Sequence, residues 1–441
     1  MDNRFVGIDE KPPFPSLLLL GIQHVLVLFS GLAAVPLVVG MSLGLSSAEI
    51  TILVQGSLII SGIGTLIQCL GLGHLGARLP ICMGSAFVFI APSITIGSQM
   101  GIQAVFGASM VCGLIAYILS FFIGRLQKLI PPLVTGTIVS LIGIKLLPLG
   151  FIWLAGGEGD LYGKPVCFII GGFVLVALLV ASQSRKGLLS SFSVIIAIML
   201  GYVISAMFGI LDLHHVQSAS WVSFPDMLHF GWPTFSYSAV AIMMIAQLTA
   251  VLESIGNTYG TGAAVSRKIT HKHLSGAISV DGIGSIIAPL FNGFSLTCFA
   301  QNIGVISITH VASRYVVAAA GAVLIALGLI PKFSAVVAGM PAPVLGGASL
   351  IMFGSIVGSG VAQIKDSGPF DQRAAMIFST SLALGLGFGL APKGAFDAFP
   401  SSLAVLLESG VAIGGITAIV LNLVLPRTDA PKIAEEPEHQ E

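Results

Sequence analysis

Apolar runs of about 20 residues recur along this chain from its N-terminal region to residue 425. A helix of that length crosses the roughly 30 Å hydrocarbon layer of a lipid bilayer. Average soluble domains carry about 25% charged residues, whereas this chain has 9% charged residues and a mean hydropathy of +1.00. These features predict an all-α membrane protein that forms a single polytopic domain over residues 1–441, with no attached soluble domain.

Several other classes of protein are disfavoured by the same composition. The first apolar run, 17–40, is too long for the hydrophobic part of a secretory signal peptide and lacks a small-residue cleavage site, so it is expected to remain as a span. The five cysteines show no C-x-x-C spacing, and therefore no metal site, disulfide framework or cofactor is expected. The net charge of zero argues against a nucleic-acid partner, because phosphate binding needs concentrated Lys and Arg.

Turn signals and charges divide the chain into fourteen apolar segments. Their approximate bounds are 15–41, 48–72, 80–97, 102–124, 131–149, 164–183, 190–212, 236–259, 274–291, 296–312, 315–338, 343–363, 374–391 and 401–425. With the N-terminus in the cytoplasm, the 19 Lys and Arg residues all fall on the inner side except Lys145, within a span, and Lys164, Lys332 and Lys393, outside. The positive-inside rule predicts this asymmetry. A multi-pass inner-membrane protein with both termini cytoplasmic, including the tail 426–441, is therefore expected.

Two segments differ from ordinary membrane helices. The third, at 80–92, is short and bounded by prolines, and the tenth is preceded by a polar, β-favouring stretch at 292–302. They lie seven spans apart, as two inverted repeats of seven spans would place them. Interrupted segments at matching positions indicate a transporter site, because unwound backbone persists inside a membrane only where it lines a cavity. The alternative is that Gly and Pro merely kink these helices.

Ionisable side chains within the spans are few, and each costs about 2.5 to 3.5 kcal/mol at the bilayer centre. Glu253 lies well inside the eighth span, with Asn257 one helical turn later on the same face, so the two are expected to form a polar pair facing inward. Asp281 interrupts the ninth span. Burial disfavours the charged form of a carboxylate, and a group that exchanges a proton as its surroundings change suits proton coupling. The structural alternative is an internal hydrogen bond that fixes helix packing.

Other polar groups have weaker signals. Gln301 and Asn302 open the tenth span, where two amides can converge with the carboxylates. His24, in the first span, is equally consistent with a functional imidazole and with a hydrogen-bonded packing residue. Lys145 and Glu408 lie near span ends, which favours a structural interpretation.

Residues 301–310, Gln-Asn-Ile-Gly-Val-Ile-Ser-Ile-Thr-His, closely resemble the signature of the nucleobase/ascorbate transporter family. That signature reads Gln, Glu or Pro, then Asn-x-Gly-x-x-x-x-Thr, and usually ends in Arg, Lys or Gly. Supporting matches run along nearly the whole chain: Gln23-His24, Gly-Ser-Ala-Phe at 84–87, Glu-Ser-Ile-Gly at 253–256, Asp281, and Val-Ala-Ser-Arg-Tyr at 311–315. His310 departs from the usual end of the signature, which leaves selectivity or inner-gate behaviour open.

The resemblance implies a fold of fourteen transmembrane segments in two inverted seven-span repeats. A core domain would comprise about 15–124 and 236–338, and a gate domain about 131–212 and 343–425. Substrate would lie between them, near short antiparallel strands in spans 3 and 10. A homodimer in the lipid bilayer is implied in the same way.

The resemblance also implies a substrate class. Gln at the first signature position, here Gln301, is similar to the xanthine and uric acid branch, whereas Glu there goes with uracil carriers. A neutral amide both donates and accepts hydrogen bonds, which matches a purine edge with a carbonyl beside a ring nitrogen. If the roles of the family's residues apply at the matching positions here, Glu253 accepts hydrogen bonds from ring N–H groups, Gln301 binds the opposite edge of the purine and Phe87 stacks on its ring.

The remaining site residues follow from the same motifs. Ser85 and the backbone near Phe299 and Ala300 complete the substrate site. Asn302 holds the start of the tenth segment in shape, and His24 and Asn257 support the site. Asp281 either supports the site or carries the proton, so the proton acceptor is left open between Asp281 and Glu253.

These inferences predict a transporter rather than an enzyme: a symporter that imports xanthine, uric acid or both with protons, by alternating access. A uracil or other pyrimidine carrier on the same scaffold is the first alternative. An anion exchanger or channel is the second, but it would use basic or helix-end sites, whereas this interior is acidic and rich in amides. An intramembrane enzyme ranks last, because no H-E-x-x-H motif and no nucleophile-and-base constellation is visible. The choice between xanthine and uric acid as the substrate, and between a proton and a sodium ion as the coupling ion, is left open.

Overall fold

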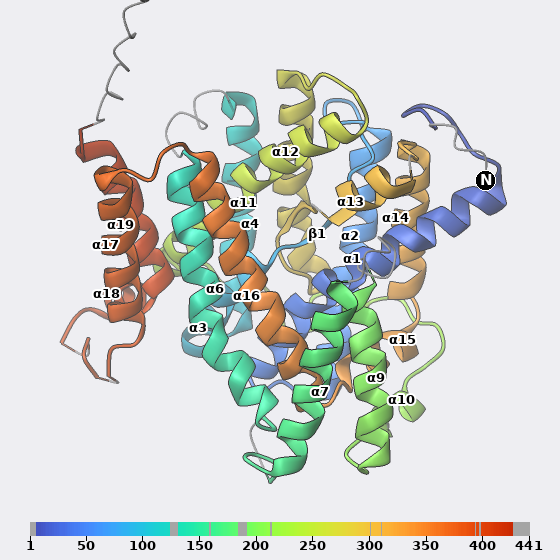
Figure 1. Cartoon of the computed structure of the whole chain (residues 1–441), viewed down its shortest axis with the longest axis horizontal. Coiled ribbons are helices and arrows are strands. Elements are labelled where there is room, and N and C mark those ends of the chain that lie inside the picture. Colours follow the sequence, from blue (N-terminus) through green and yellow to red (C-terminus); the bar gives the residue numbers. More distant parts are fainter. Residues whose placement is uncertain are drawn as a thin grey trace, which may run out of the picture.

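The computed structural model describes residues 6–123, 131–157, 160–183, 192–211, 214–299, 301–309, 311–392, 394–396 and 398–426, and it is almost entirely helical (Figure 1). The longer helices are α1 (Phe14–Ser42), α2 (Ser47–Leu70), α4 (Ile102–Leu119), α6 (Pro132–Leu154), α7 (Pro165–Ser182), α9 (Ser193–Met207), α11 (Tyr237–Ala264), α12 (His271–Ile287), α14 (Arg314–Gly328), α16 (Ala342–Asp366), α17 (Gln372–Gly389) and α19 (Gly410–Val424). The shorter elements are β1 (Met83–Ser85), α3 (Ile90–Met100), α10 (His214–Ser218), β2 (Leu296–Cys298), α13 (Gln301–Thr309), α15 (Pro331–Ala338), α18 (Ser401–Glu408) and the 3₁₀ turns η1 (Phe87–Phe89), η2 (Ser120–Phe122) and η3 (Ala288–Phe291).

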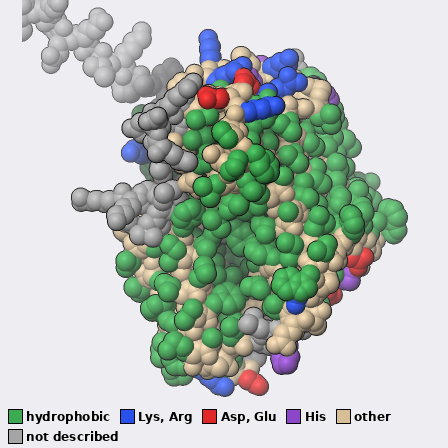
Figure 2. All heavy atoms as spheres, turned by 90° about the vertical axis from the view of Figure 1, so that its right-hand side faces the viewer, with side chains coloured by type: hydrophobic (Ala, Val, Ile, Leu, Met, Phe, Trp, Pro, Cys, Tyr) green, Lys and Arg blue, Asp and Glu red, His purple; other side chains and the backbone are tan. Residues whose placement is uncertain are grey.

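The helices have the length and apolarity of membrane spans. Among the described residues, eight helices are long and apolar enough to cross a membrane, and nine if α14 and α15 count as one bent span. Figure 2 shows a broad hydrophobic side of the molecule, with charged side chains gathered toward its two ends. The chain is thus a mostly helical, multi-pass membrane protein. The count of fourteen segments stays a prediction.

Two of the apolar segments are each divided into two helices. The segment 315–338 divides into α14 and α15, which meet at 82°. Pro331 begins α15, and a proline disfavours the helical conformation at the residue before it, here Ile330 with φ −110° and ψ 89°. The segment 401–425 divides at Ser409, whose hydroxyl caps α19 by accepting a hydrogen bond from the Ala412 N–H. Each of these apolar segments therefore contains two helices rather than one.

A small antiparallel sheet lies near the centre of the molecule (Figure 1). Strands β1 and β2 come from the two segments that were expected to be interrupted, 80–92 and 292–302, and all their residues are buried. In an apolar interior each unpaired backbone group costs several kcal/mol. The hydroxyls of Thr65 and Ser285 accept hydrogen bonds from the first N–H of β1 and of β2, at 2.9 and 3.0 Å. Side chains of neighbouring helices therefore bond to backbone N–H groups that the short sheet leaves unpaired.

The helices pack in two sets around this sheet. In the first, α1, α2 and α14 pack against one another, as do α4, α11 and α12. In the second, α6, α7, α9, α16, α17 and α19 pack together, with α6 lying along α16. Contacts between the sets run mainly through α11, which touches α6, α18 and α19. Whether these sets act as a core and a gate domain stays a prediction.

Candidate functional site

A cavity of about 430 Å³ lies where the sheet faces α6, α9 and α16. Its walls come from α1, α11, β2 and the turn after β1 on one side, and from the second set of helices on the other. Small-molecule sites have volumes of about 300 to 1,000 Å³ and hold a few polar groups in an apolar lining. The cavity thus has the size of a site for one small molecule, and it lies between the two sets.

Glu253 supplies the charge of this cavity. It lies on α11, is half-buried, and among the described residues that line the cavity it is the only ionisable acid or base of the Asp, Glu, Lys, Arg and His types. An ionised carboxylate only accepts hydrogen bonds, so this wall suits a ligand that presents N–H groups. Asn257 lies one turn further along but does not pair with Glu253: its amide donates to the Cys298 carbonyl at 2.8 Å. The expected polar pair is therefore replaced by a contact between α11 and β2.

A second contact fixes β2 to the same helix. The Ser254 hydroxyl lies 2.7 Å from the Thr297 hydroxyl and accepts a hydrogen bond from the Cys298 N–H at 3.1 Å. Both hydroxyls are buried, where hydrogen bonds are expensive to leave unmade. Sequence reasoning assigned no role to Ser254 or Thr297. The signals were present, since Ser254 follows Glu253 directly and Thr297 lies in the β-favouring stretch.

Two aromatic rings also line the cavity. Phe87 begins η1, Phe299 follows β2, and both side chains are among the lining residues. Aromatic rings offer flat faces on which a heteroaromatic ligand can stack. Ser85 is placed differently, because it is fully buried, lies outside the cavity lining and donates its hydroxyl to the Phe294 carbonyl at 3.3 Å. The structure thus brings Glu253, Phe87 and Phe299 together at one cavity, and Ser85 supports the strand beside it.

His24 and Asn302 form a separate buried contact. The Asn302 amide nitrogen lies 3.2 Å from Nδ1 of His24 and 2.7 Å from Sγ of Cys82. Both side chains are 2% exposed and neither lines the cavity. The contact joins α13 to α1 and to the segment before β1, so it holds the start of α13 in place.

Asp281 lies on α12 and is fully buried. Its carboxylate accepts a contact from the Cys298 thiol at 3.7 Å, and it is not among the cavity-lining residues. Because Cys298 belongs to β2 and does line the cavity, Asp281 lies behind this strand. It is placed to support the site rather than to touch a ligand in the cavity.

The signature residues lie next to the site. Gln301 is the first residue of α13, which begins three residues after β2. Its side chain lies outside the part of the chain that the structure describes, as do Ala300 and His310. Their predicted roles stay predictions.

The opposite wall was missed by sequence reasoning. Ser355, Ser359 and Gln363 of α16 line the cavity. They recur every four residues, and such positions share one face of a helix. This polar face on an otherwise apolar helix is the signal that could have identified the wall.

Comparison with known proteins identifies the family. A family model described as "Permease family" (Xan_ur_permease) matches residues 15–394. The uric acid transporter UacT of Escherichia coli (strain K12) is 37% identical over 414 residues, which cover 92% of this chain and 85% of the relative. The xanthine permease of Bacillus subtilis (strain 168) is 34% identical over 412 residues, covering 93% of this chain and 94% of the relative.

A solved structure supports the same fold. The transmembrane domain of the cyanobacterium bicarbonate transporter BicA matches with a TM-score of 0.61 at 14% identity, covering 95% of this chain and 99% of that one. This likeness concerns the fold alone. The family and these relatives are transporters, not enzymes. The chain therefore belongs to the Xan_ur_permease family, the nucleobase/ascorbate transporter family.

Proposed function

We propose that this chain is a proton-coupled symporter that imports a purine base, xanthine or uric acid or both. The observation that carries the proposal is the cavity in which Glu253 meets the rings of Phe87 and Phe299. A carboxylate matches the ring N–H groups of a purine, and aromatic faces match its flat surface. The relatives named as uric acid transporter and xanthine permease support the same substrate class.

The proposed binding mode uses three kinds of contact. Glu253 accepts hydrogen bonds from ring N–H groups, Phe87 stacks on the ring, and the Gln301 amide binds the opposite edge. The backbone near Phe299 and Ala300 completes the site. Ser254 and Asn257 keep β2 fixed against α11, as their hydrogen bonds to Cys298 support. Purine recognition then rests on a preorganised strand and helix.

Transport is proposed to proceed by alternating access. One set of helices, with α1, α2, α11 and the two strands, acts as the core, and the other, with α6, α9 and α16, acts as the gate. The cavity between them supports this division, because residues of both sets line it. Glu253 or Asp281 takes up the transported proton. The wider proposal includes fourteen segments in two inverted repeats, a homodimer, and an inner-membrane orientation with both termini in the cytoplasm.

An anion exchanger on the same fold is the second candidate, and the cavity disfavours it. Among the described residues that line the cavity, none is Lys or Arg, and the one charged side chain is acidic. An inorganic anion that is held by charge alone would find no Lys or Arg among these described lining residues.

Uptake of radiolabelled xanthine and uric acid into cells that lack their own purine carriers tests the proposal. We expect uptake that collapses with a protonophore and that excess uracil does not compete away. Gln301→Glu is expected to raise competition by uracil, because a carboxylate replaces a group that both donates and accepts. Full accumulation of the protein without uptake of either purine would contradict the proposal, and strong competition by uracil would favour the pyrimidine alternative.

Gly84→Ala is expected to raise the KM for uric acid about tenfold. A Cβ atom at Gly84 would lie 2.4 Å from Cε2 of Phe299, so this ring of the cavity wall must move. Overpacking of this kind costs about 1 to 3 kcal/mol of folding stability, and a displaced ring that costs about 1.4 kcal/mol of binding free energy lowers affinity tenfold. The measurement is concentration-dependent uptake, with Gly172→Ala as the matched control because a Cβ there meets nothing within 4 Å. An unchanged KM in Gly84→Ala would show that Phe299 does not shape the site.

A further inference from the structure

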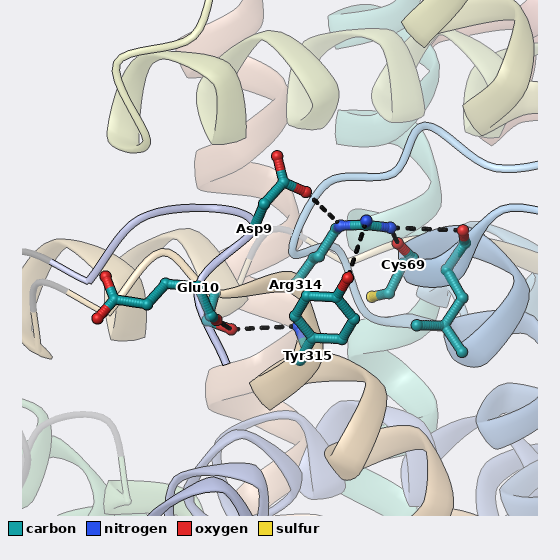
Figure 3. A network of polar contacts seen from close by, with 7 residues as sticks. Asp9, Glu10, Cys69, Arg314 and Tyr315 are labelled. Carbon is teal, nitrogen blue, oxygen red and sulfur yellow. Dashed lines mark hydrogen bonds and ion pairs between the residues drawn. The ribbon is translucent and has the colours of Figure 1, made fainter. Parts of the chain in front are cut away.

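The first described residues of the chain pack against a distant segment. Residues 6–11, the N-terminal strap, run along residues 311–314, which follow α13 (Figure 3). Three hydrogen bonds and one backbone bridge join them: Ala312 N–H to the Val6 carbonyl (2.9 Å), Arg314 N–H to the Ile8 carbonyl (3.0 Å), the Ser313 hydroxyl to the Glu10 carbonyl (2.6 Å), and a parallel bridge between Val6 and Val311. The strap is therefore fixed beside the end of the signature segment by an isolated β-bridge at Val6 and by the hydrogen bonds of the turn that follows it.

Arg314 is the centre of this contact. Its Nε donates to the Asp9 carboxylate at 2.7 Å, and Nη1 donates to the carbonyls of Cys69 and Leu70 at 3.0 and 3.4 Å (Figure 3). Nη2 donates to the Tyr315 hydroxyl at 3.1 Å. Leu70 ends α2, where the last carbonyls lack partners within the helix. One guanidinium group thus connects the strap, the end of α2 and the start of α14, which the single ammonium group of a lysine cannot reproduce.

The strap also contacts the ring next to Arg314. The Lys11 ammonium lies 4.5 Å from the centroid of Tyr315, and the Arg314 guanidinium carbon lies 4.8 Å from it. Cations over an aromatic face are attracted by about 0.5 to 1 kcal/mol at exposed sites. These contacts account for the motif at 311–315, to which substrate binding and proton coupling assign no role.

Helix α13 is held at both ends by the N-terminal part of the chain. At its start, the Asn302 amide contacts His24 of α1, and α1 begins three residues after the end of the strap. At its end, the strap binds the residues that follow Thr309. A helix of nine residues is about 13 Å long and moves as a stiff unit, so a shift at its end displaces Gln301 at its start.

We propose that the N-terminal strap, acting through Asp9 and Arg314, is a positioning device that fixes α13 and so holds Gln301 in place for substrate. This inference rests on the proposed function. The strap contacts α2 and the start of α14 and leads into α1, and all three belong to the same set of helices. It therefore moves with that set during transport. Releasing it changes substrate affinity and leaves the turnover rate nearly constant.

The test compares five variants by concentration-dependent xanthine uptake, normalised to the amount of transporter in the membrane. Asp9→Asn and Arg314→Lys each raise KM about two- to fivefold, the range expected for one partly exposed ion pair. Deletion of residues 2–11 raises KM about tenfold. Asp9→Glu keeps the carboxylate and therefore the wild-type KM. Glu10→Gln is the matched control, because among the described residues the Glu10 side chain bonds within the strap alone, to the Gly7 N–H, and an amide oxygen can still accept there.

The outcomes separate this inference from the proposed function. Absence of purine uptake by the wild-type protein overturns the proposed function and this inference with it. Wild-type uptake together with unchanged KM in Asp9→Asn and in the deletion variant overturns the strap alone. A lower amount of transporter with unchanged KM also overturns it, because the strap then only stabilises the fold. A raised KM with a near-constant maximal rate per transporter supports it.

Discussion

Replacing Glu253 by Gln is expected to reduce purine uptake by about 100-fold. The carboxylate is the one charge of the cavity among its described lining residues, and hydrogen bonds to a charged group contribute about 1.5 to 3 kcal/mol each. Glutamine has nearly the same size, but it removes the charge and replaces one of the two acceptor oxygens by an N–H donor, which cannot pair with a ring N–H group of a purine. The measurement is initial uptake of radiolabelled xanthine, normalised to transporter in the membrane.

Glu408→Gln is the matched control for this variant. Glu408 is also a carboxylate at a membrane helix, but it lies on α18, outside the cavity, and contacts the amide of Gln99. Its replacement is expected to change uptake less than threefold, since partly exposed pairs contribute about 0 to 1 kcal/mol. Near wild-type uptake by Glu253→Gln would remove Glu253 from the substrate site.

Replacing Gly56 by Ala is expected to lower stability by about 3 kcal/mol or more. A Cβ atom on Gly56 would lie 1.7 Å from the carbonyl oxygen of Phe291, and this backbone cannot move without displacing η3 and the segment that leads to β2. Overpacking against backbone exceeds the usual cost of an extra methyl group. Thermal unfolding of the purified protein in detergent is the measurement, and a clearly lowered melting temperature is the expected result.

Gly172→Ala again provides the control, because a Cβ there meets nothing within 4 Å, and alanine favours a helix more than glycine does. It is expected to leave the melting temperature unchanged or slightly raised. Equal melting temperatures for Gly56→Ala and wild type would show that α2 and η3 are not in rigid contact.

The part of the site that sequence reasoning predicted consists of residues with strong local signals. Glu253 is an intramembrane carboxylate, and such a group is costly to bury and is therefore by default a candidate functional residue. Phe87 and Phe299 belong to or adjoin segments whose composition marked them as interrupted. The signature at 301–310 indicated the family, and the family model and relatives that match most of the chain confirm it.

The parts that were missed depend on tertiary packing. Ser355 donates its hydroxyl to the Ile351 carbonyl within α16, as serine can do on any helix face, so its residue type does not show that it lines a cavity. The motif positions Ser85 and Phe87 are two residues apart, yet only Phe87 reaches the cavity, because the chain leaves β1 for η1 between them. The strap joins residues about 300 positions apart, and no local pattern predicts such a pairing.

The most direct test of the central claim is substrate accumulation by the purified protein in proteoliposomes with an imposed pH gradient, acidic outside. We predict that xanthine or uric acid accumulates above its outside concentration, that a protonophore abolishes the accumulation, and that Glu253→Gln vesicles do not accumulate substrate. Equilibration at the same rate with and without the gradient, or accumulation of uracil in place of both purines, would contradict proton-coupled purine transport.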